Sequence, residues 1–424
     1  MRILAIYRHY WPDATPYARL LRAILEDQVM QGRAASVFTA QPGYNDVDYS
    51  RQPLRETLGG VDVRRISLLS ERKHLRFLRA INYVYFLFRA VLHVLCFRRY
   101  DLIVANTHPP VLMGVALRLI RRLTGIPFVL HCQDIHPESA LLGKQMREGP
   151  IARWFRRADT KSCAVAERVV TLSEDMKLTL RHREGYSANN VAVINNFALD
   201  VYEQAEDVPE IFNVTPSRPF RVFFAGNMGP FQDLPRLVEA AHVLCAERDI
   251  HFIFMGAGTE LRTLRQLATD LIGKTVFFEP FQPVEVAFDC MKRADLGVVS
   301  LRAGMCQVAY PSKTMTYLAA GCPLLLLAER DSQLANDIVD HDFGYVPEKT
   351  TSEGIALTIR TARTERERWA AAARQELTAR SETYFGKHEM LIRWRELLDG
   401  VDRSCVGEVV TFPANQVAKQ RRAA

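Results

Sequence analysis

The sequence lacks the residue patterns that mark several classes of protein. Its eight cysteines form no CxxC pair and have no histidines at the spacing of metal ligands, so we expect reduced thiols and no zinc site. It contains no HExxH motif that could bind a metal ion. It also contains no basic stripe with interleaved aromatic residues, and we therefore expect no nucleic-acid partner. The first apolar run, Ile3–Tyr7, is too short for a signal peptide, which predicts a cytoplasmic protein.

Long uncharged apolar runs are also missing. Ile81–Phe97 comes nearest to a membrane-spanning helix, but it is shorter than the roughly 20 residues that cross a bilayer, and it contains Arg89 and His93. Two interpretations remain for this segment: a helix buried in the protein, or a helix lying on the membrane surface. The second interpretation uses flanking basic residues that suit anionic lipid, namely Arg72, Lys73, Arg76, Arg79, Arg98 and Arg99.

What is present is an ordinary globular composition. The chain has 424 residues, of which 48% are hydrophobic and 24% charged. A single hydrophobic core stops growing at roughly 250–300 residues, so we expect two domains. The formal net charge of +7 fits anionic partners such as nucleotide diphosphates or anionic lipids, without selecting one of them.

Apolar strand-like runs alternate with helical patterns along most of the chain. This alternation predicts an α/β fold built from two doubly wound, Rossmann-like domains that face each other across a cleft. Thr15-Pro16 reads as a helix cap followed by proline at the first helical position. We place the N-terminal domain at 1–197, a proline-containing linker at 198–219, the C-terminal domain at 220–385, a helix that packs back on the N-terminal domain at 386–402, and a disordered tail at 403–424.

Two glycine-rich turns follow strands of the predicted C-terminal domain. Gly226-Asn227-Met228-Gly229 and Gly256-Ala257-Gly258 occupy equivalent positions, one strand–helix unit apart. Glycines there let the backbone approach a phosphate or a sugar and leave amide groups able to donate. Close packing of the turns is the alternative explanation.

Polar residues cluster at two further points. Tyr310-Pro311-Ser312-Lys313 opens a helix that Ser312 is placed to cap, and Lys313 is expected to meet a bound diphosphate, with a solvated lysine as the alternative. His131–Glu138 (HCQDIHPE) follows a strand of the first domain, so Asp134, His136 and Glu138 are expected to face the cleft unless they only form a hydrogen-bonded turn. Asp46-Val47-Asp48 resembles a DxD metal motif, but aspartates are common in loops, and we expect no metal site.

These segments together resemble glycosyltransferase family 4, the retaining enzymes of the GT-B fold, over the chain to about residue 398. In particular they resemble bacterial enzymes of O-antigen, capsule and colanic-acid assembly. The segments that carry the resemblance are YRHYWPDATPYARLLRAILEDQVMQGRAASVFT, HCQDIHPES, VINNF, FFAGNMGPFQDLPRLVEAA, FIFMGAGTEL, RADLGVVSL and YPSKTMTYLAAGCPLLL.

The resemblance implies that the C-terminal domain binds a nucleotide-diphosphate-sugar donor and that the N-terminal domain binds the acceptor, with retention of configuration and no required metal or other cofactor. Carried over by position, Lys313 meets the diphosphate, and Asp134 and His136 face the transferred sugar or the acceptor. Thr15 and Glu138 fall on the acceptor side. The remaining donor-side positions are Gly226, Asn227, Gly229, Gly256, Gly258, Ser312 and Thr316.

The chain departs from the family pattern at three places. Gln232-Asp233 stands where the family often has a Lys-Gly pair, and we expect Lys313, with Arg302, to supply the missing positive charge. Val308 and Thr316 stand where the family has paired glutamates, and Ala14-Thr15 stands where it has a Gly-Gly pair.

We expect a lipid-linked saccharide as the acceptor and a location at the cytoplasmic face of a membrane. The alternatives are a catalytically degenerate nucleotide-sugar-binding subunit and a GT-B sugar-nucleotide epimerase.

Overall fold

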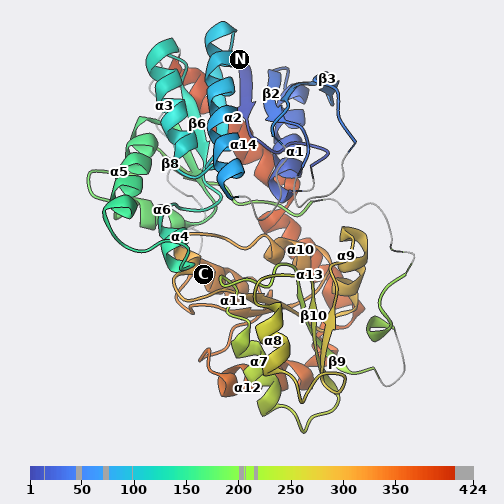
Figure 1. Ribbon diagram of the computed structural model, residues 1–424. Coiled ribbons are helices and arrows are strands. Elements are labelled where there is room, and N and C mark those ends of the chain that lie inside the picture. The colour runs from blue at the N-terminus through green and yellow to red at the C-terminus, as the bar shows by residue number, and fades with distance from the viewer. Residues whose placement is uncertain are drawn as a thin grey trace, which may run out of the picture.

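The computed structural model describes residues 1–13, 15–43, 50–69, 76–97, 99–199, 205, 207–213 and 218–405. Within these residues the chain forms two α/β domains, one above the other in Figure 1, each with a predominantly parallel sheet and helices packed on it. The predicted α/β architecture of two Rossmann-like domains is therefore confirmed.

The sheet of the N-terminal domain has the strand order β3-β4-β2-β1-β5-β6-β7-β8. Its strands are β1 (Arg2–Ile6), β2 (Ala34–Ala40), β3 (Arg55–Leu58), β4 (Val61–Ile66), β5 (Leu102–Asn106), β6 (Phe128–His131), β7 (Arg168–Thr171) and β8 (Val191–Val193). Its helices are α1 (Pro16–Met30), α2 (Arg76–Cys96), α3 (Leu112–Thr124), α4 (Glu138–Leu142), α5 (Pro150–Val165) and α6 (Glu174–Arg181).

One part of this sheet departs from the predicted alternation of strands and helices. β3 and β4 form an antiparallel hairpin at the sheet edge, joined by Gly59 and Gly60, whose φ angles are +55° and +80°. Positive φ at both turn residues suits the tight hairpin turn that matches strand twist. β3 alternates exposed and half-buried residues, as expected for an edge strand with one solvated face, so its sequence carries only a weak apolar signal.

The sheet of the C-terminal domain has the order β11-β10-β9-β12-β13-β14, with every pair parallel. Its strands are β9 (Phe220–Ala225), β10 (Ile250–Met255), β11 (Val276–Glu279), β12 (Leu296–Ser300), β13 (Leu324–Leu327) and β14 (Gly344–Tyr345). Its helices are α7 (Pro235–Val243), α8 (Leu261–Leu267), α9 (Val284–Arg293), α10 (Lys313–Ala319), α11 (Gln333–Asp340) and α12 (Ser352–Thr364), with short 3₁₀ turns η2 (Glu210–Phe212), η3 (Met305–Gln307) and η4 (Arg366–Trp369).

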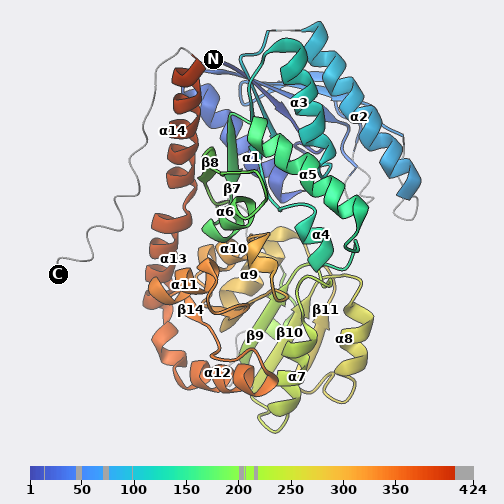
Figure 2. The same ribbon diagram turned by 90° about the vertical axis from the view of Figure 1, so that its left-hand side faces the viewer.

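The last two helices connect the domains. α12 is followed by η4 and then by α13 (Ala371–Phe385). α14 (Lys387–Cys405) then rises along the N-terminal domain, as Figure 2 shows, and so begins one residue later and ends three residues later than expected. Arg395 of α14 pairs with the buried Asp27 of α1, and the Trp394 ring packs 4.9 Å from the His131 ring. Residues 406–424 of the predicted tail lie outside the described residues.

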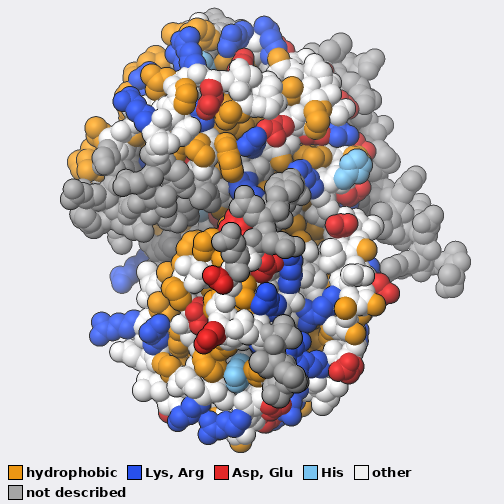
Figure 3. All heavy atoms as spheres, turned by 90° about the vertical axis from the view of Figure 1, so that its right-hand side faces the viewer, with side chains coloured by type: hydrophobic (Ala, Val, Ile, Leu, Met, Phe, Trp, Pro, Cys, Tyr) orange, Lys and Arg blue, Asp and Glu red, His pale blue; other side chains and the backbone are white. Residues whose placement is uncertain are grey.

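The predicted linker is only partly described, but it includes one anchored turn. In η2, Phe212 is fully buried and its ring lies 4.8 Å from that of Phe223 in β9. This segment therefore packs on the C-terminal domain, although its sequence shows no helical or strand period. On the face shown in Figure 3, basic side chains are scattered over both domains among acidic and hydrophobic ones.

Helix α2 contains the apolar run Ile81–Phe97. Among the described residues, Phe77–Cys96 is the one helical segment long and apolar enough to cross a membrane. Only 28% of its most apolar stretch is buried inside the protein. Phe86, Ala90 and Val94 join the core, and the Phe86 ring lies 5.7 Å from that of Phe38 in β2. α2 therefore lies on the N-terminal domain with one face in the core. It does not match the predicted alternative of a largely buried helix, because the opposite face is exposed and apolar.

Candidate active site between the two domains

Two cavities lie between the domains and share one rim. The C-domain cavity, about 430 Å³, is lined mainly by residues of the C-terminal domain, including Phe224, Phe231, Gln232, Ser300, Met305 and Lys313. The N-domain cavity, about 590 Å³, is lined mainly by the N-terminal domain, including Tyr7, His9, Thr15, Arg19, Asn106, His108, Gln133 and Asn196. Asp134, His136, Tyr310 and Ser312 line both cavities. A ligand in one cavity would therefore meet a ligand in the other at these four residues.

The position of the cavities follows from strand order. β1 lies between β2 and β5: the strands that follow it in the chain lie on one side of it up to β4 and on its other side from β5 onward. His9 and His108 lie in the loops after β1 and β5. The next strand, β6, leads directly to Asp134. In the second sheet the corresponding switch lies between β9 and β12, and Lys313 follows β12. Ligands of doubly wound sheets bind at such switch points, beyond the carboxyl ends of the strands.

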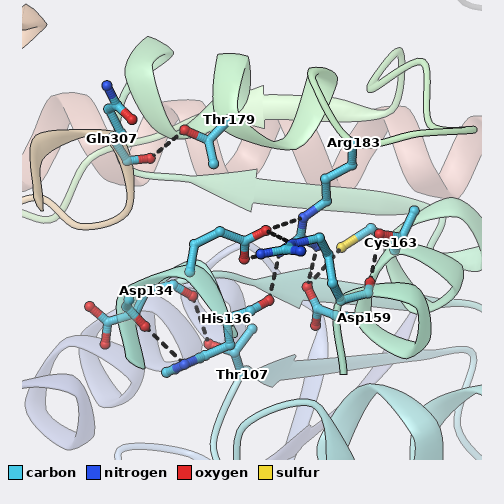
Figure 4. Close-up of polar contacts among 12 residues, drawn as sticks. Thr107, Asp134, His136, Asp159, Cys163, Thr179, Arg183 and Gln307 are labelled. Atoms are coloured by element: carbon cyan, nitrogen blue, oxygen red, sulfur yellow. Dashed lines mark hydrogen bonds and ion pairs between the residues drawn. The ribbon is translucent and has the colours of Figure 1, made fainter. Parts of the chain in front are cut away.

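Backbone hydrogen bonds join the two domains directly beside the cavities. The amide of Ile135 donates to the carbonyl of Val308 at 2.8 Å, and Asp134 and Ala309 form an antiparallel bridge. The Thr179 hydroxyl of α6 donates to the carbonyl of Gln307 at 2.7 Å, as Figure 4 shows. Residues 307–309 of the C-terminal domain are thus held against the N-terminal domain from two sides. This arrangement brings Asp134 to the mouth of the C-domain cavity.

Lys313 carries a buried ammonium group in the C-domain cavity. Its Nζ lies 3.7 Å from the centre of the Phe224 ring and makes no hydrogen bond within the described structure. Burial lowers the pKa of Lys313 to about 7. A Cβ at Gly226 would lie 2.6 Å from Lys313 Cε, so glycine at 226 makes room for the lysine side chain. A desolvated cation with no hydrogen-bond acceptor is suited to meet an anionic ligand.

The two glycine-rich turns pack against each other. A Cβ at Gly256 would lie 2.1 Å from the Gly226 carbonyl oxygen, and one at Gly258 would lie 2.1 Å from the Met228 carbonyl oxygen. The amides of Gly226, Gly229 and Gly256 donate to acceptors within the protein.

The expectation that these amides are free to bind a ligand is therefore wrong for Gly226, Gly229 and Gly256. None of the four glycines lines either interdomain cavity, and Asn227 is exposed outside both. Gly258 lines a separate surface pocket beside α8. Close approach of the two turns explains the glycines, which is the packing alternative that the sequence left open.

Ser312 does not cap the helix that it precedes. It adopts helical backbone angles, and its side chain accepts no capping hydrogen bond, so the predicted cap is incorrect. The residue is exposed and lines both cavities, which leaves its hydroxyl facing the shared rim. One turn later, Thr316 lines the N-domain cavity, and its hydroxyl donates to the Ser312 carbonyl at 3.3 Å.

Asp134 and His136 occupy the shared rim. Asp134 is open to the cleft, but the surrounding walls of both domains desolvate its carboxylate and raise its pKa to about 6. His136 Nδ1 lies 2.9 Å from the Ser139 hydroxyl, and burial lowers its pKa to about 4. Below its pKa Asp134 is a neutral acid, and above it a carboxylate that can accept a proton or a hydrogen bond.

Glu138 lies in an ion-pair cluster instead of in a cavity. It pairs with Arg183 at 2.7 Å and with Arg156 at 3.1 Å, and Arg183 also pairs with Asp159 at 2.6 Å (Figure 4). Burial opposes ionisation of Glu138, but the two guanidinium groups prevail and hold its pKa below the usual value. Arg183 also donates to the His136 carbonyl at 2.6 Å. The cluster therefore fixes the loop that carries Asp134 and His136.

Thr15 has a local structural role and a place in the N-domain cavity. Its side chain accepts a hydrogen bond from the Ala18 amide at 3.2 Å, and Pro16 opens α1, as the sequence predicts. His9, Asn106 and His108 also line this cavity, although no motif in the sequence marks them. Their signal is position alone, because each stands at or just after the carboxyl end of β1 or β5.

The departures from the family pattern have local explanations. The Gln232 side chain accepts from the Gly229 amide at 3.0 Å, and Asp233 adopts φ +46°, a conformation that suits glycine. Val308 is 1% exposed, so its side chain lies in the core. Arg302 lines neither interdomain cavity. Ala14 and Asp46–Asp48 lie outside the described residues, among which no group of three or more His, Cys, Asp or Glu suits a metal ion.

Two facing Rossmann-like domains with ligand cavities between their strand ends are the architecture of the GT-B glycosyltransferases. Residues 6–196 match the model of the glycosyl transferase 4-like domain, and residues 219–362 match the glycosyl transferases group 1 model. The chain belongs to the family 4-like glycosyltransferases.

Similarities to individual proteins are consistent with this family. The chain is 25% identical over 253 residues to the probable glycosyltransferase WbjE of Pseudomonas aeruginosa, across 58% of this chain and 62% of that protein. It is 24% identical over 348 residues to the protein named "Putative colanic acid biosynthesis glycosyl transferase WcaI" of Escherichia coli (strain K12), across 79% of this chain and 85% of that one. The crystal structure of Anabaena HepE in complex with UDP superposes with a TM-score of 0.65 at 15% identity, covering 94% of this chain and all of that one.

Proposed function

We propose that the protein transfers a sugar from a nucleotide-diphosphate sugar to a lipid-linked saccharide in the synthesis of a cell-surface polysaccharide. The observation that carries the proposal is the pair of joined cavities, with a buried ammonium group in one and titratable groups at their shared rim. The complex of HepE with UDP and the colanic-acid description of WcaI support the donor class and the pathway class.

The donor occupies the C-domain cavity in this proposal. Lys313 approaches the diphosphate, and the donor supplies the anionic partner that its ammonium group otherwise lacks. Ser312, at the rim, lies close to the bond between the sugar and the phosphate. Because Gln232 replaces a family lysine and is engaged with the Gly229 amide, Lys313 carries more of the leaving-group charge than in relatives with both cations.

The acceptor occupies the N-domain cavity and presents a hydroxyl at the shared rim. Its oxygen attacks the anomeric carbon on the face from which the diphosphate departs, so the anomeric configuration is retained. The C–O bond to the phosphate breaks, a new C–O bond forms, and the hydroxyl proton passes to the departing phosphate. Asp134 and His136 orient the hydroxyl. The step needs no metal ion, because Lys313 offsets the developing negative charge.

The membrane meets the protein along α2, α3 and α5, which lie side by side in Figures 1 and 2. α2 exposes Phe77, Val84 and Phe88 by 78%, 61% and 56%, respectively. The neighbouring helices add exposed apolar residues beside exposed arginines: Leu119, Leu123, Ile151 and Trp154 with Arg122, Arg153 and Arg157. Apolar side chains bordered by arginines suit insertion into the interface of an anionic bilayer. This surface would keep the enzyme at the cytoplasmic face, where a lipid-linked acceptor is anchored.

A thermal-shift screen against UDP, GDP, ADP and dTDP and their sugars tests the donor assignment. A ligand that binds only the folded protein raises its apparent stability once its concentration exceeds the dissociation constant. We expect one nucleotide to raise the melting temperature in the wild-type protein and less so in Lys313→Met. The absence of a shift with every nucleotide would contradict the proposed donor site.

A further inference from the structure

Two side-chain amides in the wall of the N-domain cavity are bonded to each other. The Asn196 side-chain nitrogen donates to the Gln133 side-chain oxygen at 2.8 Å, and the Gln133 side-chain nitrogen donates back to the Asn196 side-chain oxygen at 3.4 Å. Both residues line the cavity, and Asn196 is 7% exposed. Gln133 follows β6 and Asn196 follows β8, so the amide pair joins two loops at the carboxyl ends of strands.

His131, the last residue of β6, sets the orientation of the Gln133 amide. Its Nε2 lies 2.8 Å from the Gln133 side-chain nitrogen, and its Nδ1 lies 3.1 Å from the Tyr17 hydroxyl. Burial lowers the pKa of His131 to about 3, so the neutral ring has one donating and one accepting nitrogen. Because an amide nitrogen only donates, Nε2 accepts from Gln133, and the ring proton lies on Nδ1, toward Tyr17.

Two aromatic rings hold the imidazole in place. The Tyr17 ring lies 5.3 Å from the His131 ring at an angle of 64°, and the Trp394 ring lies 4.9 Å from it at 63°. Trp394 belongs to α14, which runs along the N-terminal domain in Figure 2. His131 is 1% exposed and lines neither interdomain cavity. It can therefore act on a ligand only through the side chains that it contacts.

The amide pair keeps hydrogen-bonding groups that the protein does not use. Both hydrogens of the Gln133 amide are taken, one by His131 and one by Asn196. Among the described residues neither amide group has a further partner, so one hydrogen remains on the Asn196 nitrogen and one acceptor position on each side-chain oxygen. Neighbouring hydroxyls of a sugar both donate and accept, and they match one donor beside two acceptors on groups of fixed position.

We propose that Gln133 and Asn196 bind neighbouring hydroxyl groups of the acceptor saccharide, and that His131 is a positioning residue that holds the Gln133 amide in the required orientation. The inference rests on the proposed function, because it takes the N-domain cavity as the acceptor site. Without the accepting nitrogen of His131, the Gln133 amide loses the partner that sets which of its ends faces Asn196. A sugar held by the pair lies beside the shared rim, because Asp134 directly follows Gln133 in the chain.

Titration by saturation-transfer NMR with methyl α-glucoside, methyl α-galactoside and methyl α-mannoside tests the inference on the full-length protein. The last two probes each differ from the first at one ring carbon, so a site that bonds neighbouring hydroxyls binds the three unequally. We expect His131→Phe and Gln133→Met each to weaken binding of the preferred glycoside about three- to tenfold, as for loss of one neutral hydrogen bond, and to reduce the discrimination. His131→Gln, whose side-chain oxygen can take the place of Nε2, should restore most of both.

His93→Phe is the matched control for the loss of a buried histidine. His93 is 6% exposed, stacks on the Phe38 ring at 4.9 Å and lies 2.8 Å from the Tyr100 hydroxyl, but it lines neither cavity. We expect this variant to bind the glycosides as wild type does. A positioning role also predicts that the double variant His131→Phe/Gln133→Met binds no more weakly than Gln133→Met, whereas independent effects would add.

Additive losses in the double variant would overturn the inference, and so would unchanged discrimination in His131→Phe. Failure of wild type to bind any of the three glycosides would overturn it as well. The titration uses no donor and measures no turnover, so a protein that behaves as expected here yet transfers no sugar would contradict the proposed function alone.

Discussion

The ammonium nitrogen of Lys313 lies 3.7 Å from the centre of the Phe224 ring and has no hydrogen-bond partner among the described residues. A cation–π contact replaces only part of the hydration that burial removes. Glycine at position 226 leaves room for this side chain, because a Cβ there would lie 2.6 Å from Lys313 Cε. The ligand-free protein thus keeps a destabilised cation at the point where the proposed mechanism needs one.

Replacing this cation with an isosteric neutral side chain separates stability from activity. We expect Lys313→Met to unfold at the same or a higher denaturant concentration than wild type, because a buried unpaired polar group is removed. We expect kcat/KM for the donor to fall by about 100-fold or more, as for loss of one group that stabilises transition-state charge. Lys292→Met is the control, since Lys292 also lies over a ring, that of Phe288, but at the surface. A fully active Lys313→Met variant would exclude the proposed role.

The lowered pKa of Lys313 predicts that donor binding takes up a proton. With a pKa of about 7 in the free protein, the side chain is mostly neutral at pH 8, and a bound diphosphate raises its pKa and restores the charge. Calorimetry in two buffers of different ionisation enthalpy should show uptake approaching one proton at pH 8 and little at pH 6. Donor affinity should accordingly fall as pH rises above 7. Unchanged uptake in Lys313→Met would assign the proton to another group.

The raised pKa of Asp134 predicts an acid limb in the pH–rate profile. The carboxylate form is present above about pH 6 and is lost as pH falls through that value. We therefore expect kcat to fall below pH 6, and Asp134→Asn to lower kcat about 100-fold and to remove that limb. Asp101→Asn, at an exposed ion pair with Arg2, serves as the control. An acid limb that persists in Asp134→Asn would have to come from a different group.

The ion-pair cluster beneath the Asp134 loop predicts a stability effect. Arg183 is 3% exposed and pairs with both Glu138 and Asp159, so Arg183→Met leaves two carboxylates in a poorly solvated site. Urea unfolding should show a loss of about 3–5 kcal/mol. Arg156→Met removes the more exposed partner of Glu138 and should cost about 1 kcal/mol or less. Similar losses for the two variants would mean that burial does not set the strength of the cluster.

The exposed face of α2 predicts binding to anionic vesicles. Substituting Phe77 and Phe88 with aspartate removes apolar area and adds negative charge, and both changes oppose insertion. We expect sedimentation with vesicles that contain an anionic lipid to fall several-fold. Val339→Asp, at an exposed apolar residue of α11 in the other domain, is the control. Equal sedimentation of the two proteins would reject α2 as the membrane contact.

The parts of the fold that follow simple periodicity could be predicted from the sequence. Buried parallel strands such as β1 and β9 read as continuous apolar runs, and Thr15-Pro16 marked the start of α1. The β3–β4 hairpin departs from the predicted alternation, and the sequence does not reveal it because the edge strand β3 carries few apolar residues. The break at η4 has no signal in the sequence, because residues 365–370 continue the Arg- and Glu-rich pattern of the helices on either side.

Part of the candidate site could likewise be predicted from the sequence, and part could not. Asp134, His136 and Lys313 stand in loops after strands, and the structure brings them to the two joined cavities. The packing role of the glycines and the ion pairing of Glu138 could not be predicted, because both depend on contacts between segments far apart in the sequence. His9 and His108 are isolated residues in the sequence, and only the adjacency of β1 and β5 shows that they share a wall.

Acceptor-dependent release of nucleoside diphosphate tests the central claim most directly. The protein is incubated with the nucleotide sugar identified by thermal shift, with and without a polyprenyl-diphosphate-linked saccharide. Transfer predicts release only with acceptor, an acceptor enlarged by one sugar, and loss of both in Lys313→Met. Conversion of the donor sugar to its epimer without acceptor, or donor binding with no release under either condition, would contradict the assignment of the protein as an active glycosyltransferase.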